Sequence, residues 1–306
     1  MFDSSKDTEK GTLYYRIKEE KVTITSYSGR DNELILPEEI DGFPVRKISK
    51  KAFLNSRQMV KIVLPDTIRK VSDWAFAHSS NLETVEFPRK NISFGKGVFL
   101  GDARLVRIML RDRNGSEAFV STLSDKEKDD MAVLLAAAAG MKNADYLLDL
   151  KAAGSHEWYR MLDRVITDIL DEDDEEGHME MILCGEEDID CTIEAYVAAR
   201  RKDKARWAFH RLIHDTGLSD GLREKLKNYI TDHTVGSDSE EAWEVLLTEK
   251  SHITEYYKLF YDIGGINDSN YDDVILAAGD KTPEMKAYFM REHKDNSGDY
   301  FASFEI

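Results

Sequence analysis

The chain has 306 residues, of which 42% are hydrophobic and 33% charged, and its net charge is −17. This composition is typical of a globular protein, and the length leads us to expect two domains. No run reaches the roughly 18 apolar residues of a membrane-spanning helix, and the polar start of the sequence lacks the apolar core of a signal peptide. We therefore expect a cytoplasmic protein.

The charges are unevenly distributed. Residues 1–115 carry 21 basic and 16 acidic side chains, a net charge of +5, whereas residues 116–306 carry 21 basic and 43 acidic ones, a net charge of −22. This asymmetry predicts two domains, 1–115 and 116–306. The strongly acidic second half argues against nucleic acid or an anionic membrane as its partner. Cys184 and Cys191 are too few for a disulfide framework and are expected to be buried thiols in a reducing compartment.

Residues 12–27 show the alternation of two short strands around a polar turn at 18–21. We expect this pair to cap the repeats that follow, because the first repeat of a solenoid otherwise exposes its apolar end.

From Leu34 to Leu110 one pattern occurs three times. An aromatic residue recurs at a constant spacing, at Phe53, Phe76 and Phe99. A fixed period between roughly 20 and 50 residues indicates a solenoid in which each repeat forms one coil. Short strands are expected at 62–64, 85–87 and 108–110, ended in the first two repeats by a proline, which cannot donate to a ladder.

Alternation within these strands separates inward from outward positions. The outward residues, which we predict as a partner-binding strand face, are Lys61, Val63, Thr84, Glu86, Arg107 and Met109. Ser56, Ser79 and Asp102 share one repeat position, where a short polar side chain can bond free backbone groups at a corner.

The phrase Ile40-Asp41-Gly42-x-Pro44-Val45, followed by Ala52-Phe53 and Ile62-x-Leu64-Pro65, resembles the BspA-type (Treponema pallidum type) leucine-rich repeat over residues 12–112. The resemblance implies a short right-handed solenoid with a parallel strand ladder, used for adhesion or protein recognition. Two departures are the absence of cysteine at the corner position and a third repeat with Asn91, Gly95 and Gly97.

After Gly115 the hydrophobic period changes from strand-like to helical. Glycines at the expected ends predict short helices in antiparallel pairs. The predicted ranges are 125–139, 143–153, 156–170, 178–184, 189–201, 203–215, 220–232, 239–249, 252–262, 271–278 and 283–293. The pairs around 195–209 and 274–288, which align with each other without a gap, resemble degenerate ankyrin-type hairpins, although the Thr-Pro-Leu-His motif is absent.

Three motifs resemble sites of chemistry. A match to the nucleophile elbow occurs at Gly217-Leu218-Ser219-Asp220-Gly221, but a helix rather than the required strand is expected before it. We therefore interpret Gly217 as the C′ residue of one helix and Ser219 or Asp220 as the N-cap of the next. His210 and His214 lie four residues apart, a spacing that could bind zinc on one helix face, but no third ligand is evident. Gly95, Gly97 and Gly101 lie within a repeat, where they ease tight corners rather than bind phosphate.

The acidic run at 171–176 invites comparison with a calcium-binding loop. An EF-hand loop needs glycine at its sixth position, where Glu176 stands. We interpret the run as a solvated, mobile loop, because its like charges repel one another.

The sequence therefore predicts an α+β, two-domain protein: a leucine-rich β-solenoid followed by an all-α helical-hairpin repeat domain. We expect a non-enzymatic scaffold that binds a protein partner, with no catalytic residues, metal or cofactor. The alternatives are a bacterial surface or secreted adhesin and an enzyme with its site in the acidic half, which would need a pocket with mutually shifted pKa values.

Overall fold

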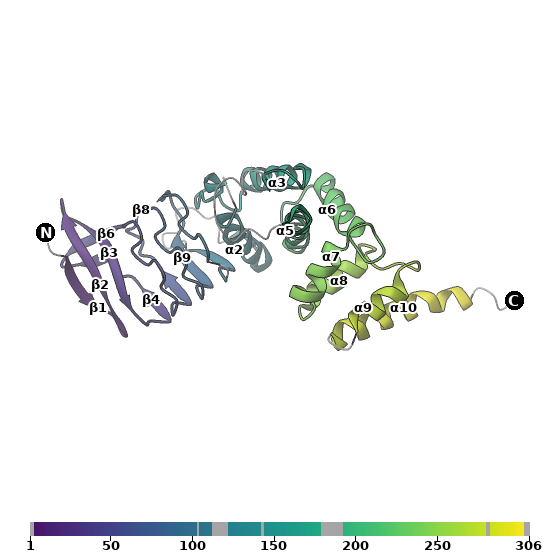
Figure 1. Ribbon diagram of the computed structural model, residues 1–306. Helices are drawn as coiled ribbons and strands as arrows, with labels where there is room; N and C mark the ends of the chain where they lie inside the picture. Colours follow the sequence, from purple (N-terminus) through teal and green to yellow (C-terminus); the bar gives the residue numbers. More distant parts are fainter. Residues whose placement is uncertain are drawn as a thin grey trace. The chain divides into compact units, whose positions relative to one another are not determined.

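The computed structural model describes residues 3–102, 104–111, 122–141, 144–178, 192–279 and 282–302. They belong to two compact units, Met1–Leu162 and Asp163–Ile306. Strands dominate the first part of the chain and helices the rest, as Figure 1 shows, which confirms the α+β layout with a solenoid followed by a helical region.

The solenoid begins with an antiparallel hairpin, β2 (Gly11–Lys18) and β3 (Lys21–Gly29), at the two strands expected within 12–27. A further strand, β1 (Ser4–Asp7), pairs with β2 and escaped prediction because all four of its residues are exposed and it lacks apolar alternation. The hairpin joins the coils through β3, which pairs in parallel with β6 (Phe43–Ile48).

Successive coils form two sheets. One is a parallel ladder in the order β11–β9–β7–β4, made of β4 (Glu33–Ile35), β7 (Lys61–Val63), β9 (Thr84–Pro88) and β11 (Arg107–Arg111). Its register pairs Ile62 with Val85 and Val85 with Ile108, one sequence period apart, so the predicted ladder is confirmed. The other sheet runs β1–β2–β3–β6–β8–β10 through β8 (Lys70–Val71) and β10 (Ser93–Phe94), with β5 (Glu39–Ile40) paired to β6.

The three repeated phenylalanines stack in the interior of the solenoid. The ring centroids of Phe53 and Phe76 are 5.2 Å apart and those of Phe76 and Phe99 5.6 Å, with interplanar angles of 18° and 8°. Tyr27 extends the stack from the capping hairpin, 5.7 Å from Phe53. All three phenylalanines are buried. The constant spacing of these residues in the sequence therefore reflects one apolar column, to which each coil contributes one ring.

The shared corner position links each coil to its neighbour. The Ser79 hydroxyl donates to the carbonyl of Phe53 at 3.0 Å, and the Ser79 N–H donates to Oδ1 of Asp102 at 2.8 Å. Asp102 is buried, and its Oδ2 has no hydrogen-bond partner. Burial raises the pKa of Asp102 to about 7, against the lowering effect of the Ser79 N–H.

We expect the stability of the solenoid to fall as the pH rises from about 4 to about 7. The folded pKa of Asp102 is raised above its unfolded value, so the stabilisation is complete below the unfolded pKa and is lost once the pH has risen through the folded pKa. Allowing for solvent screening, the loss is on the order of 2 kcal/mol. Urea unfolding at several pH values measures it. Replacing Asp102 with Ser, the residue at position 79, should remove this pH dependence; an unchanged pH profile would contradict the assignment.

The third coil approaches the second so closely that a side chain cannot fit at Gly95. A Cβ there would lie 2.4 Å from the backbone nitrogen of Asp73 and 2.8 Å from the backbone carbon of Ser72. Gly95→Ala is expected to lower the free energy of unfolding by about 1–3 kcal/mol, since backbone must move. Gly221→Ala, at a helical glycine whose Cβ would meet no atom within 4 Å, is the control and should be neutral or slightly stabilising in the same thermal unfolding assay, because alanine favours a helix. Equal effects of both substitutions would contradict the packing described.

Most helices end close to one of the glycines predicted to end them. They are α2 (Asp125–Ala139), a 3₁₀ turn η1 (Asp145–Leu147), α3 (His156–Asp171), α5 (Ile193–Ile213), α6 (Asp220–Asp232), α7 (Glu241–Val245), a π turn η2 (Leu246–Lys250), α8 (Thr254–Asp262), α9 (Tyr271–Ala278) and α10 (Pro283–Ala302). The prediction of a helix over 143–153 is wrong beyond the 3₁₀ turn. The Asp149 carboxylate accepts hydrogen bonds from the N–H groups of Lys151 and Ala152 there. The range 178–184 lies almost entirely outside the described residues.

The break predicted between 201 and 203 is also wrong, since α5 runs unbroken from Ile193 to Ile213. No glycine or proline occurs in this segment, and Ala, Arg and Lys are strong helix formers. The hairpin proposed around 195–209 is therefore a single helix. Near 274–288 the chain does form two helices, α9 and α10.

Candidate interaction faces

The outward side of the ladder gathers the side chains predicted to meet a partner. The register aligns Lys61, Thr84 and Arg107 in one row. It aligns Val63, Glu86 and Met109 in the next row. Neighbouring strands lie roughly 4.8 Å apart, so each row is continuous across three coils. We call this surface the ladder face.

Exposure differs along the ladder face. Arg107 and Met109 are exposed, and Lys61, Thr84 and Glu86 are half-buried. Val63, expected to face solvent, is only 7% exposed. It lies on an inner strand of the ladder, and the Arg111 guanidinium of β11 donates to the carbonyl of the next residue, Leu64. Val63 therefore offers little area to a partner, which corrects the prediction for this residue.

Strand β4 adds two residues that the sequence analysis missed. Glu33 aligns with Lys61, and Ile35, which is 67% exposed, aligns with Val63. A signal for them exists, because Leu34-x-Leu36-Pro37 matches Ile62-x-Leu64-Pro65. The ladder face thus begins one coil earlier than expected.

Ion pairs fix the long side chains of the ladder face. Lys61 pairs with Glu33 at 2.8 Å, and the hydrogen bond from this carboxylate raises the pKa of Lys61. Arg111 pairs with Glu86 at 3.2 Å. The face therefore carries charges of both signs, joined in ion pairs, with Ile35 and Met109 as its exposed apolar groups.

The last strand is partly covered by α2. This helix packs against β11, and Asp129 pairs with Arg107 at 2.8 Å. Its start is fixed by a capping box, in which Ser124 accepts from the N–H of Glu127 and the Glu127 carboxylate accepts from the N–H of Ser124. Covering a terminal strand prevents unspecific pairing at its edge. Arg107 is thus already engaged within the chain.

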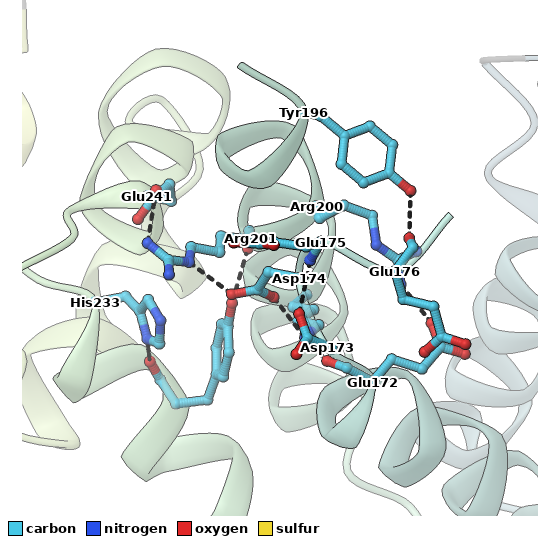
Figure 2. Close-up of polar contacts among 12 residues, drawn as sticks. Glu172, Asp173, Asp174, Glu175, Glu176, Tyr196, Arg200, Arg201, His233 and Glu241 are labelled. Carbon is cyan, nitrogen blue, oxygen red and sulfur yellow. Dashed lines mark hydrogen bonds and ion pairs between the residues drawn. The ribbon is translucent and has the colours of Figure 1, made fainter. Parts of the chain in front are cut away.

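The acidic run is mostly exposed to solvent, as predicted, but it also forms ion pairs with α5. Figure 2 shows basic side chains of α5 directed at it. Arg201 and Lys204 each bond Asp174 at 2.7 Å, Arg200 pairs with Glu172, and the Tyr196 hydroxyl donates to the carbonyl of Glu176 at 2.6 Å. The prediction of a mobile loop overlooked these cations, because they lie far from the run in the sequence.

A pocket of about 390 Å³ lies between the acidic run, α5 and the end of α6. Burial by itself would raise the pKa of Asp174, but hydrogen bonds from Lys204 and Arg201 hold it below its usual value. Burial raises the pKa of Tyr229, whose hydroxyl donates to the carbonyl of Arg201 at 3.1 Å. Both groups are thus bound to other protein groups, which is typical of a structural network.

The other motifs have structural roles. Ser219 is the N-cap of α6, where its side chain accepts from the N–H of Leu222, as expected. Helix α5 ends one residue before its cap, His214, so Gly217 lies beyond the C′ position, in the turn between the helices. The rings of His210 and His214 lie 4.8 Å apart. Within the part of the chain that the structure describes, no group of three or more His, Cys, Asp or Glu is placed to hold a metal ion.

Two remaining predictions concern membrane spans and cysteines. No helix of the described ranges is long and apolar enough to cross a bilayer. Cys184 and Cys191, expected to be buried thiols, lie outside the described residues.

Three solved structures resemble about a third of the chain. They are the Treponema pallidum leucine-rich repeat protein (27% identity, 32% of this chain and 46% of that one, TM-score 0.31), a leucine-rich cell surface protein from Faecalibacterium prausnitzii (18%, 35% and 30%, TM-score 0.30) and a leucine-rich repeat protein from Bacteroides capillosus (15%, 36% and 99%, TM-score 0.28). The chain thus spans less than half of the first two. Comparison with curated proteins gives no match.

The family comparison identifies the solenoid alone. The model of the BspA-type leucine-rich repeat region matches residues 33–124 in six copies. The ankyrin-like interpretation of the helical region stays a prediction. Residues 33–124 of this chain are therefore a BspA-type leucine-rich repeat region.

Proposed function

We propose that the chain is a non-enzymatic scaffold that binds a protein partner through the ladder face. The observation that supports this most strongly is the pair of ion pairs, Lys61 with Glu33 and Arg111 with Glu86, beside exposed Ile35 and Met109. Interfaces combine such apolar anchors with a polar rim. In this proposal residues 1–115 are the recognition domain, and residues 116–306, with their ankyrin-like helices, provide the scaffold or a second docking surface.

The test is site-specific photo-crosslinking in the source cells. A photoreactive amino acid at Thr84, in the centre of the ladder face, should give a discrete crosslinked protein, and the same group at exposed Gln58, on a turn outside the face, should not. Lys61→Glu together with Met109→Glu should abolish the Thr84 product, because both a charge pair and an apolar contact are lost. Equal crosslinking from both positions would rule the face out.

A scaffold within the cytoplasm and an adhesin at the cell surface would use the same face. Fractionation of the source cells, followed by protease treatment of intact cells, separates the two. Protection of the native protein supports the cytoplasmic scaffold, and degradation by external protease supports the adhesin.

A further inference from the structure

The second sheet of the solenoid carries a cluster of basic side chains on its outward side. The register of β6 and β8 aligns Lys47 with Lys70. Arg46 and Arg69 precede them, and their coils are joined by the hydrogen bond from the Arg69 N–H to the Arg46 carbonyl at 2.9 Å. Lys90 comes shortly before β10 in the next coil. We call these five residues the basic face.

The basic face contrasts with the ladder face in its ion pairing. None of its five cations forms an ion pair with a carboxylate of the described residues, whereas Lys61 and Arg111 on the ladder face do. Burial, followed by the charge of Arg69, lowers the pKa of Lys90 to about 8. Arg69 and Arg46 thus repel Lys90, and among the described residues the charges of Asp66 and Glu38, which form no ion pair with it, oppose this repulsion.

The two carboxylates whose charges act on Lys90, those of Asp66 and Glu38, are already engaged. Glu38 accepts from the N–H groups of Asp66 and Thr67 at 3.0 and 3.1 Å. Asp66 pairs with Arg111 at 3.3 Å. These carboxylates hold the turn after β7, so they are not free to rearrange toward the basic face.

The guanidinium groups are held in place by the backbone. Arg46 donates to the carbonyl of Thr67 at 3.0 Å, and Arg69 donates to that of Ile68, also at 3.0 Å. Like charges aligned on neighbouring strands are destabilising. A bound anion would remove this cost, and donors fixed in advance lose little entropy on binding.

We propose that the basic face binds an acidic peptide segment of a protein partner, at a site separate from the ladder face. Carboxylates on one side of an extended segment are roughly 6.8 Å apart, and adjacent strands are roughly 4.8 Å apart, so a segment crossing the sheet can meet several of the cations. The net charge of −17 disfavours long polyanions such as nucleic acid, whose binding depends on the field of the whole molecule. A short segment with few charges experiences much less of that repulsion.

The test uses the full chain and a fluorescent peptide of about eight glutamates in a polarisation assay at neutral pH. We expect saturable binding that weakens with added salt. Lys47→Glu with Lys70→Glu should raise the dissociation constant about tenfold or more. The control, Lys6→Glu with Lys10→Glu, makes the same change in net charge on exposed residues of the same unit, and it should have a much smaller effect.

Three outcomes would overturn the proposal. They are no binding of the peptide at low salt, an equal loss in the control, and tighter binding of a single-stranded oligonucleotide or of anionic vesicles than of the peptide. Met109→Glu on the ladder face should leave peptide binding unchanged, so failure here is distinguishable from failure of the ladder-face proposal. Circular dichroism of each variant verifies that the fold is retained.

Discussion

Replacing Phe76 with Ala is expected to lower the free energy of unfolding of the solenoid by about 3–5 kcal/mol. The Phe76 ring is fully buried between Phe53 and Phe99, and its removal leaves a cavity that neither neighbour can fill without breaking its own contacts. Urea unfolding followed by circular dichroism measures the effect. It is a large fraction of the stability of a typical domain.

Leu100→Ala is the control for this substitution. Leu100 is also a large apolar residue of the third coil, but it is 55% exposed, so its truncation should change stability by no more than about 0.5 kcal/mol. Phe76→Leu, which retains most of the volume, should fall between the two. If Phe76→Ala is as mild as Leu100→Ala, the aromatic column is not the core of the solenoid.

Asp163→Ala is expected to destabilise the helical unit by about 3–5 kcal/mol. Arg211, on α5, is completely buried, and its Nε donates to Oδ1 of Asp163 on α3 at 2.7 Å. The same guanidinium donates to the carbonyls of His214 and Thr216, so it also stabilises the turn after α5. Without Asp163 the buried guanidinium loses the carboxylate on α3 that balances its charge.

Replacing both partners separates the cost of removing one partner from the value of the pair. Arg211→Met with Asp163→Leu removes the charges together and should be clearly more stable than Asp163→Ala alone. Thermal unfolding of the single and double variants measures this difference. A double variant that is less stable than the single one would show that the pair itself, rather than the avoided burial of one charge, stabilises the unit.

The solenoid could be predicted from the sequence because its contacts repeat at the period of the sequence. Phe53, Phe76 and Phe99 meet one another, so the spacing of identical residues reveals which residues touch. Burial on the ladder face follows no such rule. Val63 and Met109 occupy equivalent positions, yet one is in the middle of the ladder and the other in its last strand.

The helical unit was less predictable because its decisive contacts join residues with no common period. Asp163 and Arg211 are 48 residues apart, and Asp174 and Lys204 are 30 apart. Local patterns located the ends of α6 well, because Ser219 caps that helix by itself. The same patterns placed a break in α5, where no residue ends the helix. The acidic run was judged by its own charges alone and was therefore interpreted as a mobile loop.

The most direct test of the account is disulfide formation across the ladder, in a chain whose Cys184 and Cys191 are replaced by Ser. Thr84 and Arg107 are register partners on β9 and β11, and adjacent strands lie roughly 4.8 Å apart, within the Cα separation of a disulfide. Thr84→Cys with Arg107→Cys should crosslink under mild oxidation. Thr84→Cys with Met109→Cys, displaced by two residues along β11, should crosslink far less. Equal crosslinking of both pairs, or preference for the displaced pair, would contradict the ladder and the ladder face built on it.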